Sequence, residues 1–461
     1  MNAKAIDEMI KIVGRDYVIS DIAQKQSYLY DELEISIRPE ANEDSIVVKP
    51  GNTKEISKIL KYANENRIPV VVHGGGTGLC GGIVPVFESI IISTERLNRI
   101  IEIDSDNMVA VLEAGVTLFA LLEALEKHEG ICFPVHPGDE GAQMGGMAVT
   151  NAGGARAVRH GVMRKHIEGL EVVLASGEIL MLGGKLVKNN AGYNLMNLII
   201  GSEGTLGVVT KVILKLYPEE KYTATIIASF EEFEAASKAV MDILKVGVTP
   251  LAVEYQDKHL FTGTAKMLGM EWQAQKGEAD LMIIISENTE QKYYDVCRKI
   301  EDICSRNKTC GTFIAEKKKE QADLLLIRSQ HYEYIKHMIW ESFDMAVPIA
   351  DVPLFLKDLK ELAKEYNTVT NVTAHIADGN IHNDIVLTDG KMPEYAEELK
   401  EKMLKACFKY GGTITGEHGI GKIRKEELKL QKSETELELM RGIKRLFDPN
   451  NILNPKTVID I

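Results

Sequence analysis

The chain lacks a long apolar run, a cysteine cluster and an excess of basic charge, and each absence excludes a class of protein. No run of about 18 apolar residues exists, so no transmembrane helix is expected. The six cysteines include no C-x-x-C pair, which argues against an iron–sulfur cluster and favours reduced thiols in the cytoplasm. A formal net charge of −14 argues against a nucleic-acid or anionic-membrane partner.

The N-terminal stretch MNAKAIDEMIKIVGRDYVI also lacks the apolar core and cleavage site of a secretory signal, and it predicts a helix. With 461 residues the chain is too long for one core, so two or three domains are expected. From Asp44 to about Pro218, short Val/Ile runs alternate with helical stretches and glycine clusters. The later strands follow one another without helices, which favours α+β structure over a doubly wound sheet.

A second alternating region follows Pro218. TATIIASF and DLMIIIS predict strands, while EEFEAASKAVMDILKVG and EQKYYDVCRKIEDICSRN predict amphipathic helices. The spacing favours an antiparallel sheet that carries helices on one face.

The first glycine loop lies in VVVHGGGTGLCGG, and its residues 76–81 match G-x-G-x-x-G after a strand. A dinucleotide-binding Rossmann motif must open a helix, but IVPVFESIIIS follows here, so that interpretation is rejected. The dense glycines still favour an anion held by backbone N–H groups, with a ligand-free turn as the alternative. Two more glycine-rich loops, HPGDEGAQMGGMAVTNAGGARAVRHG and GSEGTLGVVT, make a long ligand lying across backbone the better explanation.

Two histidines lie seven residues apart in HIADGNIH, around Asp378-Gly379. If that dipeptide forms a two-residue type I′ hairpin turn, His375 lies directly opposite His382. Opposed imidazoles can share a metal ion, although two structural histidines are the alternative.

The later motif TITGEHGIGKIRKEEL adds the adjacent Glu417 and His418. A carboxylate with two imidazoles suits zinc or another divalent ion, which leaves His418 as a base; a plain loop turn is the alternative.

The order GGGTGLCGG, PGDEGAQMGGMAVTNAGG, GLEVVLASGE and GSEGTLGVVT resembles the FAD-binding domain of the vanillyl-alcohol oxidase type. From about Asp44 to its C-terminus, the chain resembles the FAD-linked D-2-hydroxy-acid dehydrogenases. The resemblance implies an α+β fold: a two-subdomain FAD-binding domain and an α+β cap or substrate domain with a largely antiparallel sheet. The implied order is a helical segment (1–40), the FAD-binding domain (41–220), the cap domain with the metal motif (221–415) and a segment returning to the flavin (416–461).

The resemblance also implies which residues contact FAD. They are Gly74, Gly75, Gly76, Thr77, Gly78, Pro137, Gly138, Gln143, Gly145, Gly146, Asn151, Gly153, Gly154, His160, Gly161, Glu203, Gly204, Gly207 and Asn454. Some relatives bind flavin covalently through a histidine just after the glycine pair. Here the only nearby histidine, His73, precedes the glycines, so non-covalent FAD is expected.

The patterns H-x-x-D-G-N-x-H and G-E-H-G-I-G match those of metal-dependent relatives. The match implies that His375, His382 and Glu417 ligate a divalent ion, zinc first, with iron or manganese as alternatives. It implies that His418 is the catalytic base. Arg328 matches an arginine that holds the substrate carboxylate, with a surface helix residue as the alternative.

The implied reaction is oxidation of a D-2-hydroxy acid, first D-lactate to pyruvate, with hydride transfer to FAD. A glycolate oxidase flavin subunit and a D-2-hydroxyglutarate-type dehydrogenase are the alternatives. The lysine that the latter carries before its D-x-x-x-P strand is absent from ESFDMAVP, which favours lactate or glycolate. A metal-dependent hydrolase and a redox-inactive flavin-binding subunit are weaker hypotheses.

No second redox centre is visible, so an external acceptor is expected: first electron-transferring flavoprotein, otherwise quinone, an iron–sulfur partner subunit or oxygen. An oligomer is possible.

Overall fold

The computed structural model describes all 461 residues, and they form two compact units. Unit 1 comprises residues 1–153, 162–218 and 417–461, and unit 2 comprises residues 154–161 and 219–416. The chain therefore passes from one unit to the other after residues 153, 161, 218 and 416. None of the helices combines the length and apolar character that a membrane span requires.

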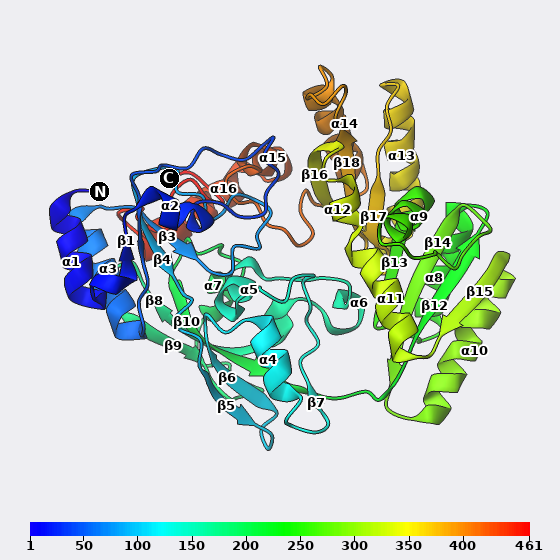
Figure 1. Ribbon diagram of the computed structural model, residues 1–461, viewed down its shortest axis with the longest axis horizontal. Helices are drawn as coiled ribbons and strands as arrows, with labels where there is room; N and C mark the ends of the chain where they lie inside the picture. The colour runs from blue at the N-terminus through cyan, green and yellow to red at the C-terminus, as the bar shows by residue number, and fades with distance from the viewer. The chain divides into compact units, whose positions relative to one another are not determined.

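The N-terminal part of unit 1 is a four-stranded sheet of order β1-β2-β4-β3, in which β2, β4 and β3 are parallel. Helices α1 and α3 pack together beside it, at the blue end of the chain in Figure 1. Ile46, Val70 and Ile90 are buried with Ile56 and Ile59 of α3, because both faces of these short strands are covered. The elements are α1 (Ala3–Val13), β1 (Val18–Ile19), α2 (Ile22–Lys25), β2 (Ile46–Val48), α3 (Thr53–Asn66), β3 (Val70–His73), β4 (Ile90–Ser93) and 3-10 turns at Arg15–Tyr17 and Gln26–Tyr28.

The rest of unit 1 is a five-stranded antiparallel sheet of order β5-β6-β10-β8-β9. Helix α5 packs on β10 and β6, and Met144 and Met147 join the core of Leu112, Leu170 and Val212. The elements are β5 (Ile100–Asp104), β6 (Val109–Glu113), α4 (Leu118–Leu125), β7 (Ile131–Cys132), α5 (Met144–Thr150), a 3-10 turn (Met163–Lys165), β8 (Ile167–Val173), β9 (Ile179–Gly183), α7 (Met196–Ile199), β10 (Val208–Lys215), β11 (Tyr217–Pro218), α15 (Lys425–Gln431) and α16 (Glu434–Phe447).

Unit 2 is built on a seven-stranded antiparallel sheet of order β15-β12-β14-β13-β17-β18-β16. Its strands are β12 (Tyr222–Phe230), β13 (Ala252–Asp257), β14 (Ala279–Glu287), β15 (Thr309–Ala315), β16 (Ile339–Ala346), β17 (Val372–His375) and β18 (Asn380–Val386). Its helices are α6 (Ala157–His160), α8 (Phe233–Lys245), α9 (Lys258–Met267), α10 (Glu290–Arg306), α11 (Lys318–Ser329), α12 (His331–Ile335), a 3-10 turn (Ile349–Asp351), α13 (Val352–Glu365) and α14 (Ala396–Lys409).

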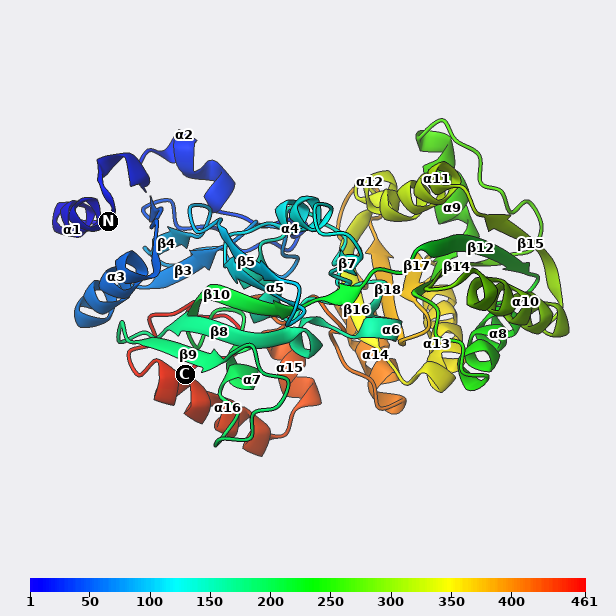
Figure 2. The same ribbon diagram turned by 90° about the horizontal axis from the view of Figure 1, so that it is seen from below.

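Helices cover both faces of this sheet, so the prediction of helices on one face is wrong. Figure 2 shows α9, α11 and α12 on one side, and α8, α10, α13 and α14 on the other. Strands β12 and β14 are buried along almost their whole length, and Ile227 and Met282 pack against Phe261 and Trp272 beside α11. A strand that is apolar on both faces shows no alternation, and the continuous apolar runs in TATIIASF and DLMIIIS were the available sign of a second helical layer.

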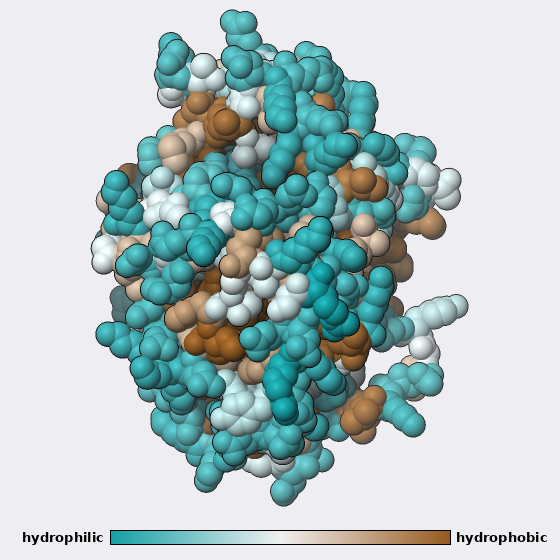
Figure 3. All heavy atoms as spheres, turned by 90° about the vertical axis from the view of Figure 1, so that its right-hand side faces the viewer, coloured by the Kyte–Doolittle hydropathy of each residue, from teal (hydrophilic) through white to brown (hydrophobic).

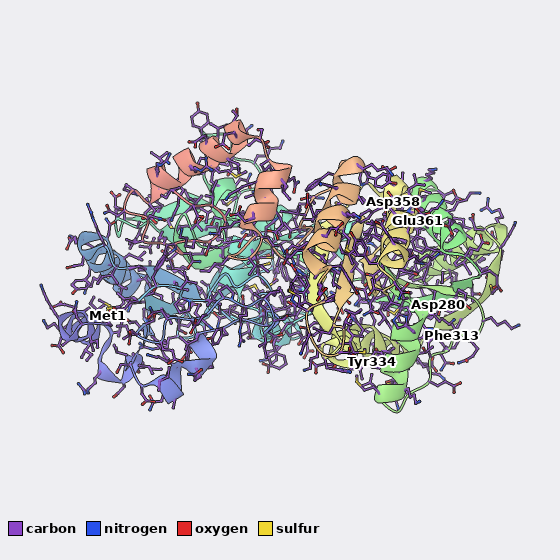
Figure 4. The ribbon with its side chains drawn as sticks, turned by 90° about the horizontal axis from the view of Figure 1, so that it is seen from above. Met1, Asp280, Phe313, Tyr334, Asp358 and Glu361 are labelled. Carbon is purple, nitrogen blue, oxygen red and sulfur yellow. The ribbon has the colours of Figure 1, made fainter.

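Polar contacts fasten the outer helices of unit 2 to one another. Asp358 of α13, labelled in Figure 4, accepts hydrogen bonds from Lys409 and Tyr410 at the end of α14, both at 2.9 Å. On the face drawn in Figure 3, hydrophilic side chains predominate and hydrophobic ones form small separate groups. Helices α13 and α14 each bury one side, which includes Phe355 and Leu399, and leave the other side exposed.

Candidate active site

The three glycine-rich loops meet around one cavity of about 220 Å³ in unit 1. Fourteen of the predicted cofactor residues line it: Gly74, Gly75, Gly76, Thr77, Gly78, Pro137, Gln143, Gly145, Gly146, Gly153, Glu203, Gly204, Gly207 and Asn454. Glu417 and His418 line the same cavity, at the start of the last segment of unit 1. The cavity therefore brings together loops that lie up to 380 residues apart in the sequence, from Gly74 to Asn454.

Five predicted cofactor residues do not line this cavity: Gly138, Asn151, Gly154, His160 and Gly161. The last three belong to unit 2, in the segment that Arg159 binds to Glu220 and to the carbonyl oxygen of Thr249. Asp31 and Thr94 line the cavity although no motif marked them. The Thr94 hydroxyl donates to the Gln143 side chain at 2.6 Å, a pairing between distant loops that no local pattern could reveal.

The glycines around the cavity serve two different purposes. A Cβ on Gly75 would lie 2.4 Å from the carbonyl oxygen of Gly141, and one on Gly145 would lie 2.7 Å from the Ala114 Cβ. Those two glycines allow the protein to pack against itself. A Cβ on Gly74 would meet nothing nearer than 3.8 Å, and one on Gly146 would meet nothing within 4 Å. Protein packing does not require a glycine at Gly146, whereas a flat ligand lying on the backbone does, which fits a bound flavin.

Replacing Gly146 with valine should weaken FAD binding without unfolding the chain. A Cβ at this position would meet no protein atom within 4 Å, and Gly146 lines the cavity, so a larger side chain competes with the cofactor for that space. We expect the FAD affinity to fall by at least about tenfold, since a single overlapping side chain costs more than about 1.4 kcal/mol. Bound flavin absorbance and thermal unfolding measure the two effects.

Gly442→Val is the matched control for this substitution. Gly442 also lies inside a helix, α16, and its Cβ would also meet nothing within 4 Å, but it is exposed. Both variants therefore undergo the same change in intrinsic helix propensity, from glycine to valine. Equal flavin content in the two variants would contradict a flavin over Gly146.

The C-terminal segment is fastened to the cavity by Asn454. Its backbone N–H donates to the carbonyl oxygen of Val70 at 2.8 Å, and its side-chain amide donates to the carbonyl oxygen of Glu203 at 2.8 Å. The N–H of Val70 in turn donates to the carbonyl oxygen of Ile452. Asn454 thus joins the strand before the first glycine loop to the third glycine loop.

A second polar cluster lies on one face of the sheet in unit 2, where β17 and β18 form a hairpin. His375 pairs with Asn380 and Thr373 pairs with His382, so the predicted register, with His375 opposite His382, is wrong by two residues. The reason is Asp378: its φ is not positive, so no type I′ turn forms, and its carboxylate accepts the N–H of Asn380 instead. A shift of two residues keeps both histidines on one face, and their ring centroids lie 5.6 Å apart.

Glu254 on β13 orients the first histidine. Its Oε1 lies 2.7 Å from His375 Nδ1, and its Oε2 accepts a hydrogen bond from Arg328 Nε at 2.7 Å. Burial would raise the pKa of Glu254, but the charges and hydrogen bonds of His375 and Arg328 hold it down to about 2. With Nδ1 held by a carboxylate, Nε2 is the ring nitrogen that can ligate a metal, the usual arrangement of metal-binding histidines. No sequence motif marked Glu254.

Asp344 on β16 lies beside the second histidine and was also missed. It lies directly opposite His382, with 3.7 Å between its Oδ1 and His382 Nδ1. Asn380, Thr415 and the N–H of Gly416 all donate to its carboxylate, at 2.7–2.9 Å. An acidic residue in an apolar strand, FDMAV, was the available signal. The imidazoles and carboxylates on this face are ligands suited to a divalent ion.

Comparisons with known proteins assign the family. Residues 219–458, more than half of the chain, match the family described as FAD linked oxidases, C-terminal domain, and residues 45–183 match the FAD binding domain family. The chain belongs to the FAD-linked oxidase family. The FAD-linked oxidase is 39% identical to a D-lactate dehydrogenase of Archaeoglobus fulgidus, across 98% of this chain and 99% of that one. It is 31% identical to glycolate oxidase subunit GlcD of Bacillus subtilis, across 97% and 95%.

Solved structures confirm the predicted fold of this FAD-linked oxidase. Substrate-bound p-cresol methylhydroxylase matches with a TM-score of 0.78 at 18% identity, across 99% of this chain and 96% of that one. The 4-ethylphenol oxidase from Gulosibacter chungangensis also matches with a TM-score of 0.78 at 18% identity, across 99% and 97%. At such identities the likeness concerns the fold alone: the α+β architecture of the vanillyl-alcohol oxidase type, with an FAD-binding domain.

Proposed function

We propose that this FAD-linked oxidase oxidises a D-2-hydroxy acid, D-lactate first, to the 2-keto acid with the help of a divalent metal ion. The observation that carries the proposal is the course of the chain at residues 415–418. Thr415 and Gly416 are hydrogen-bonded to Asp344 beside His382, and the next two residues, Glu417 and His418, line the flavin cavity. Consecutive Cα atoms are about 3.8 Å apart, so the backbone itself connects the histidine cluster to the cavity.

The groups for the chemistry are present in the chain. The glycine-loop residues that line the cavity would hold FAD, which supplies a hydride acceptor when bound. His375, His382 and Glu417 would hold the ion, zinc first or else iron or manganese, which supplies positive charge to lower the pKa of the substrate hydroxyl. His418 takes the hydroxyl proton as general base. Arg328, oriented by Glu254, provides a guanidinium for the substrate carboxylate.

The choice of D-lactate rests on relatives of that name. D-Lactate dehydrogenases of Archaeoglobus fulgidus and Anaerostipes hadrus are 39% and 32% identical over 98% of this chain. Glycolate is the second candidate, because of the likeness to GlcD. A probable D-2-hydroxyglutarate dehydrogenase of rice is 31% identical. For that substrate the support is weaker, since residues 341–343 include no lysine and Lys400, on α14, is bound to Glu341 at 3.1 Å.

The electrons must then leave the flavin for an acceptor outside the chain. No cysteine pattern for a second redox centre occurs, so we propose electron-transferring flavoprotein as the acceptor. Fast reoxidation of the reduced protein by a quinone, with none by electron-transferring flavoprotein, would rule out this acceptor and leave the first half-reaction intact.

The test is an anaerobic titration of the flavin-loaded protein with D-lactate, followed by its visible spectrum, before and after chelation and with metal added back. We expect the flavin to bleach with D-lactate but not L-lactate, and chelation to stop the bleaching. Bleaching that survives verified metal removal would contradict the metal role of His375, His382 and Glu417. Bleaching by glycolate alone would replace the substrate, and no bleaching by any 2-hydroxy acid would contradict the proposed function.

A further inference from the structure

The carboxylate of Glu203, in the third glycine loop, binds the backbone that follows His418. Its Oε1 accepts the N–H of Ile420 at 2.8 Å, and its Oε2 accepts the N–H of Gly421 at 2.7 Å. Two successive N–H groups that converge on one anion form a nest. In many proteins a nest binds a phosphate, but here the anion is a side chain of the protein itself. Glu203 thus holds two peptide groups that begin two residues after the proposed base.

The segment is held from its other side by Cys80, in the first glycine loop. The Cys80 thiol contacts the carbonyl oxygens of His418 and Gly419, and the Cys80 carbonyl accepts the N–H of Lys422 at 3.0 Å. The space between the two supports admits only glycine. A Cβ on Gly419 would lie 2.9 Å from Glu203 Oε1, and one on Gly421 would lie 1.9 Å from the Cys80 carbonyl oxygen.

Glu203 is itself fixed from its backbone. Its φ is +52°, its N–H donates to the carbonyl oxygen of Val149 at 2.7 Å, and its own carbonyl accepts the Asn454 amide. A non-glycine residue in the left-handed region costs free energy that the surrounding contacts must offset. Burial raises the pKa of Glu203 above its ordinary value, although the two N–H donors and the charge of Lys422 oppose the rise. The residue is thus rigid at both ends.

We infer that Glu203 is a positioning residue for His418: it fixes the His418–Lys422 segment, and through it the imidazole, against the flavin cavity. This inference rests on the proposed function, because it gives His418 its role as base. The resemblance places Glu203 at the flavin, and it does line the cavity. Its carboxylate oxygens, however, are directed to the backbone N–H groups of Ile420 and Gly421, in the His418–Lys422 segment. A displaced base transfers its proton less effectively, so loss of the carboxylate should slow the chemical step more than it weakens binding.

The experiment compares Glu203→Gln, Glu203→Asp and the exposed control Glu65→Gln in FAD-loaded protein. Glutamine keeps the size of the side chain but turns one acceptor into a donor that faces an N–H. Aspartate keeps both acceptors on a shorter side chain and should restore part of the effect. Hydrogen exchange of the peptide spanning residues 418–422, FAD content, and the rate of flavin reduction by the substrate are measured for each variant.

For Glu203→Gln we expect exchange at Ile420 and Gly421 to speed up by about tenfold, as for loss of a charge-assisted hydrogen bond. We expect FAD content to stay at the wild-type level, and flavin reduction to slow by about 100-fold with little change in KM. Unchanged exchange, faster exchange with an unchanged reduction rate, or loss of FAD would each overturn the inference. Failure of the proposed function has a different signature: no 2-hydroxy acid reduces the wild-type flavin, and exchange alone then decides whether Glu203 holds the segment.

Discussion

His418→Asn should slow the reduction of bound flavin by D-lactate by about 10²- to 10⁴-fold, the usual contribution of a positioned general base. Asparagine occupies similar space and keeps hydrogen-bonding capacity, but it cannot accept the hydroxyl proton. His418 lines the flavin cavity, and the backbone after it is held by Glu203 and Cys80, so the substitution should leave the loop in place. Stopped-flow absorbance under anaerobic conditions measures the rate.

FAD content and thermal unfolding of His418→Asn should match those of wild type, which separates a chemical defect from a folding defect. His337→Asn, at an exposed histidine of unit 2, is the control and should reduce its flavin at the wild-type rate. A reduction rate for His418→Asn within about threefold of wild type would be too small an effect for a general base. In that case the proton goes to another group.

Glu254→Ala should destabilise the protein by about 3–5 kcal/mol, the effect of removing one partner from a buried ion pair. Glu254 is 1% exposed, and its loss would leave the Arg328 guanidinium buried without its carboxylate. His375 would also lose the group that orients it, so the metal affinity should fall by about 10- to 100-fold. Chemical denaturation measures the first effect, and competition with a chelator measures the second.

The destabilisation by Glu254→Ala should depend on pH in a defined direction. The pKa of Glu254 falls from an ordinary value of 4.5 to about 2 on folding, so the folded state favours the ionised form. Its contribution to stability is therefore complete above pH 4.5 and is lost as pH falls from 4.5 towards 2. The difference between wild type and variant should be constant at neutral pH and narrow below pH 4.5.

Two further variants delimit this prediction. Glu254→Gln keeps one acceptor oxygen and the side-chain volume, so it should cost less than alanine. Glu271→Ala, at an exposed position of unit 2, should change stability by no more than about 0.5 kcal/mol. A cost for Glu254→Ala no larger than that of Glu271→Ala would show that the pairing with Arg328 and His375 contributes nothing to the fold.

Sequence patterns predicted the parts of this molecule that local rules govern. The glycine loops were found because only glycine tolerates the contacts at positions such as Gly75 and Gly145. The α+β class followed from strand and helix periodicity. The antiparallel character of the second sheet was visible in the spacing of β12, α8 and β14.

The misses have a common physical origin in partners that are distant in sequence. Glu254 and Asp344 lie in strands, 121 and 38 residues away from the histidines that they face, so no short motif includes both members of a pair. The hairpin register failed for a smaller reason: the Asp378 side chain bonded its own loop and kept its backbone out of the left-handed region. Side-chain competition of this kind decides turn type and cannot be read from a dipeptide.

The pairing of β3 with the segment around Leu453 determines the order in which the two units can be completed during synthesis. Val70 is bridged to Leu453, and Lys444, buried in unit 1, donates to the carbonyl oxygens of Thr205 and Leu453. A ribosome must therefore synthesise all of unit 2 before unit 1 receives its last structural residues. The glycine loops of the N-terminal half gain their contacts with residues 417–461 only after some 200 residues of unit 2 have been synthesised. A chain that stops before residue 417 lacks Glu417, His418 and Asn454, which line the cavity, so it cannot form the complete flavin site.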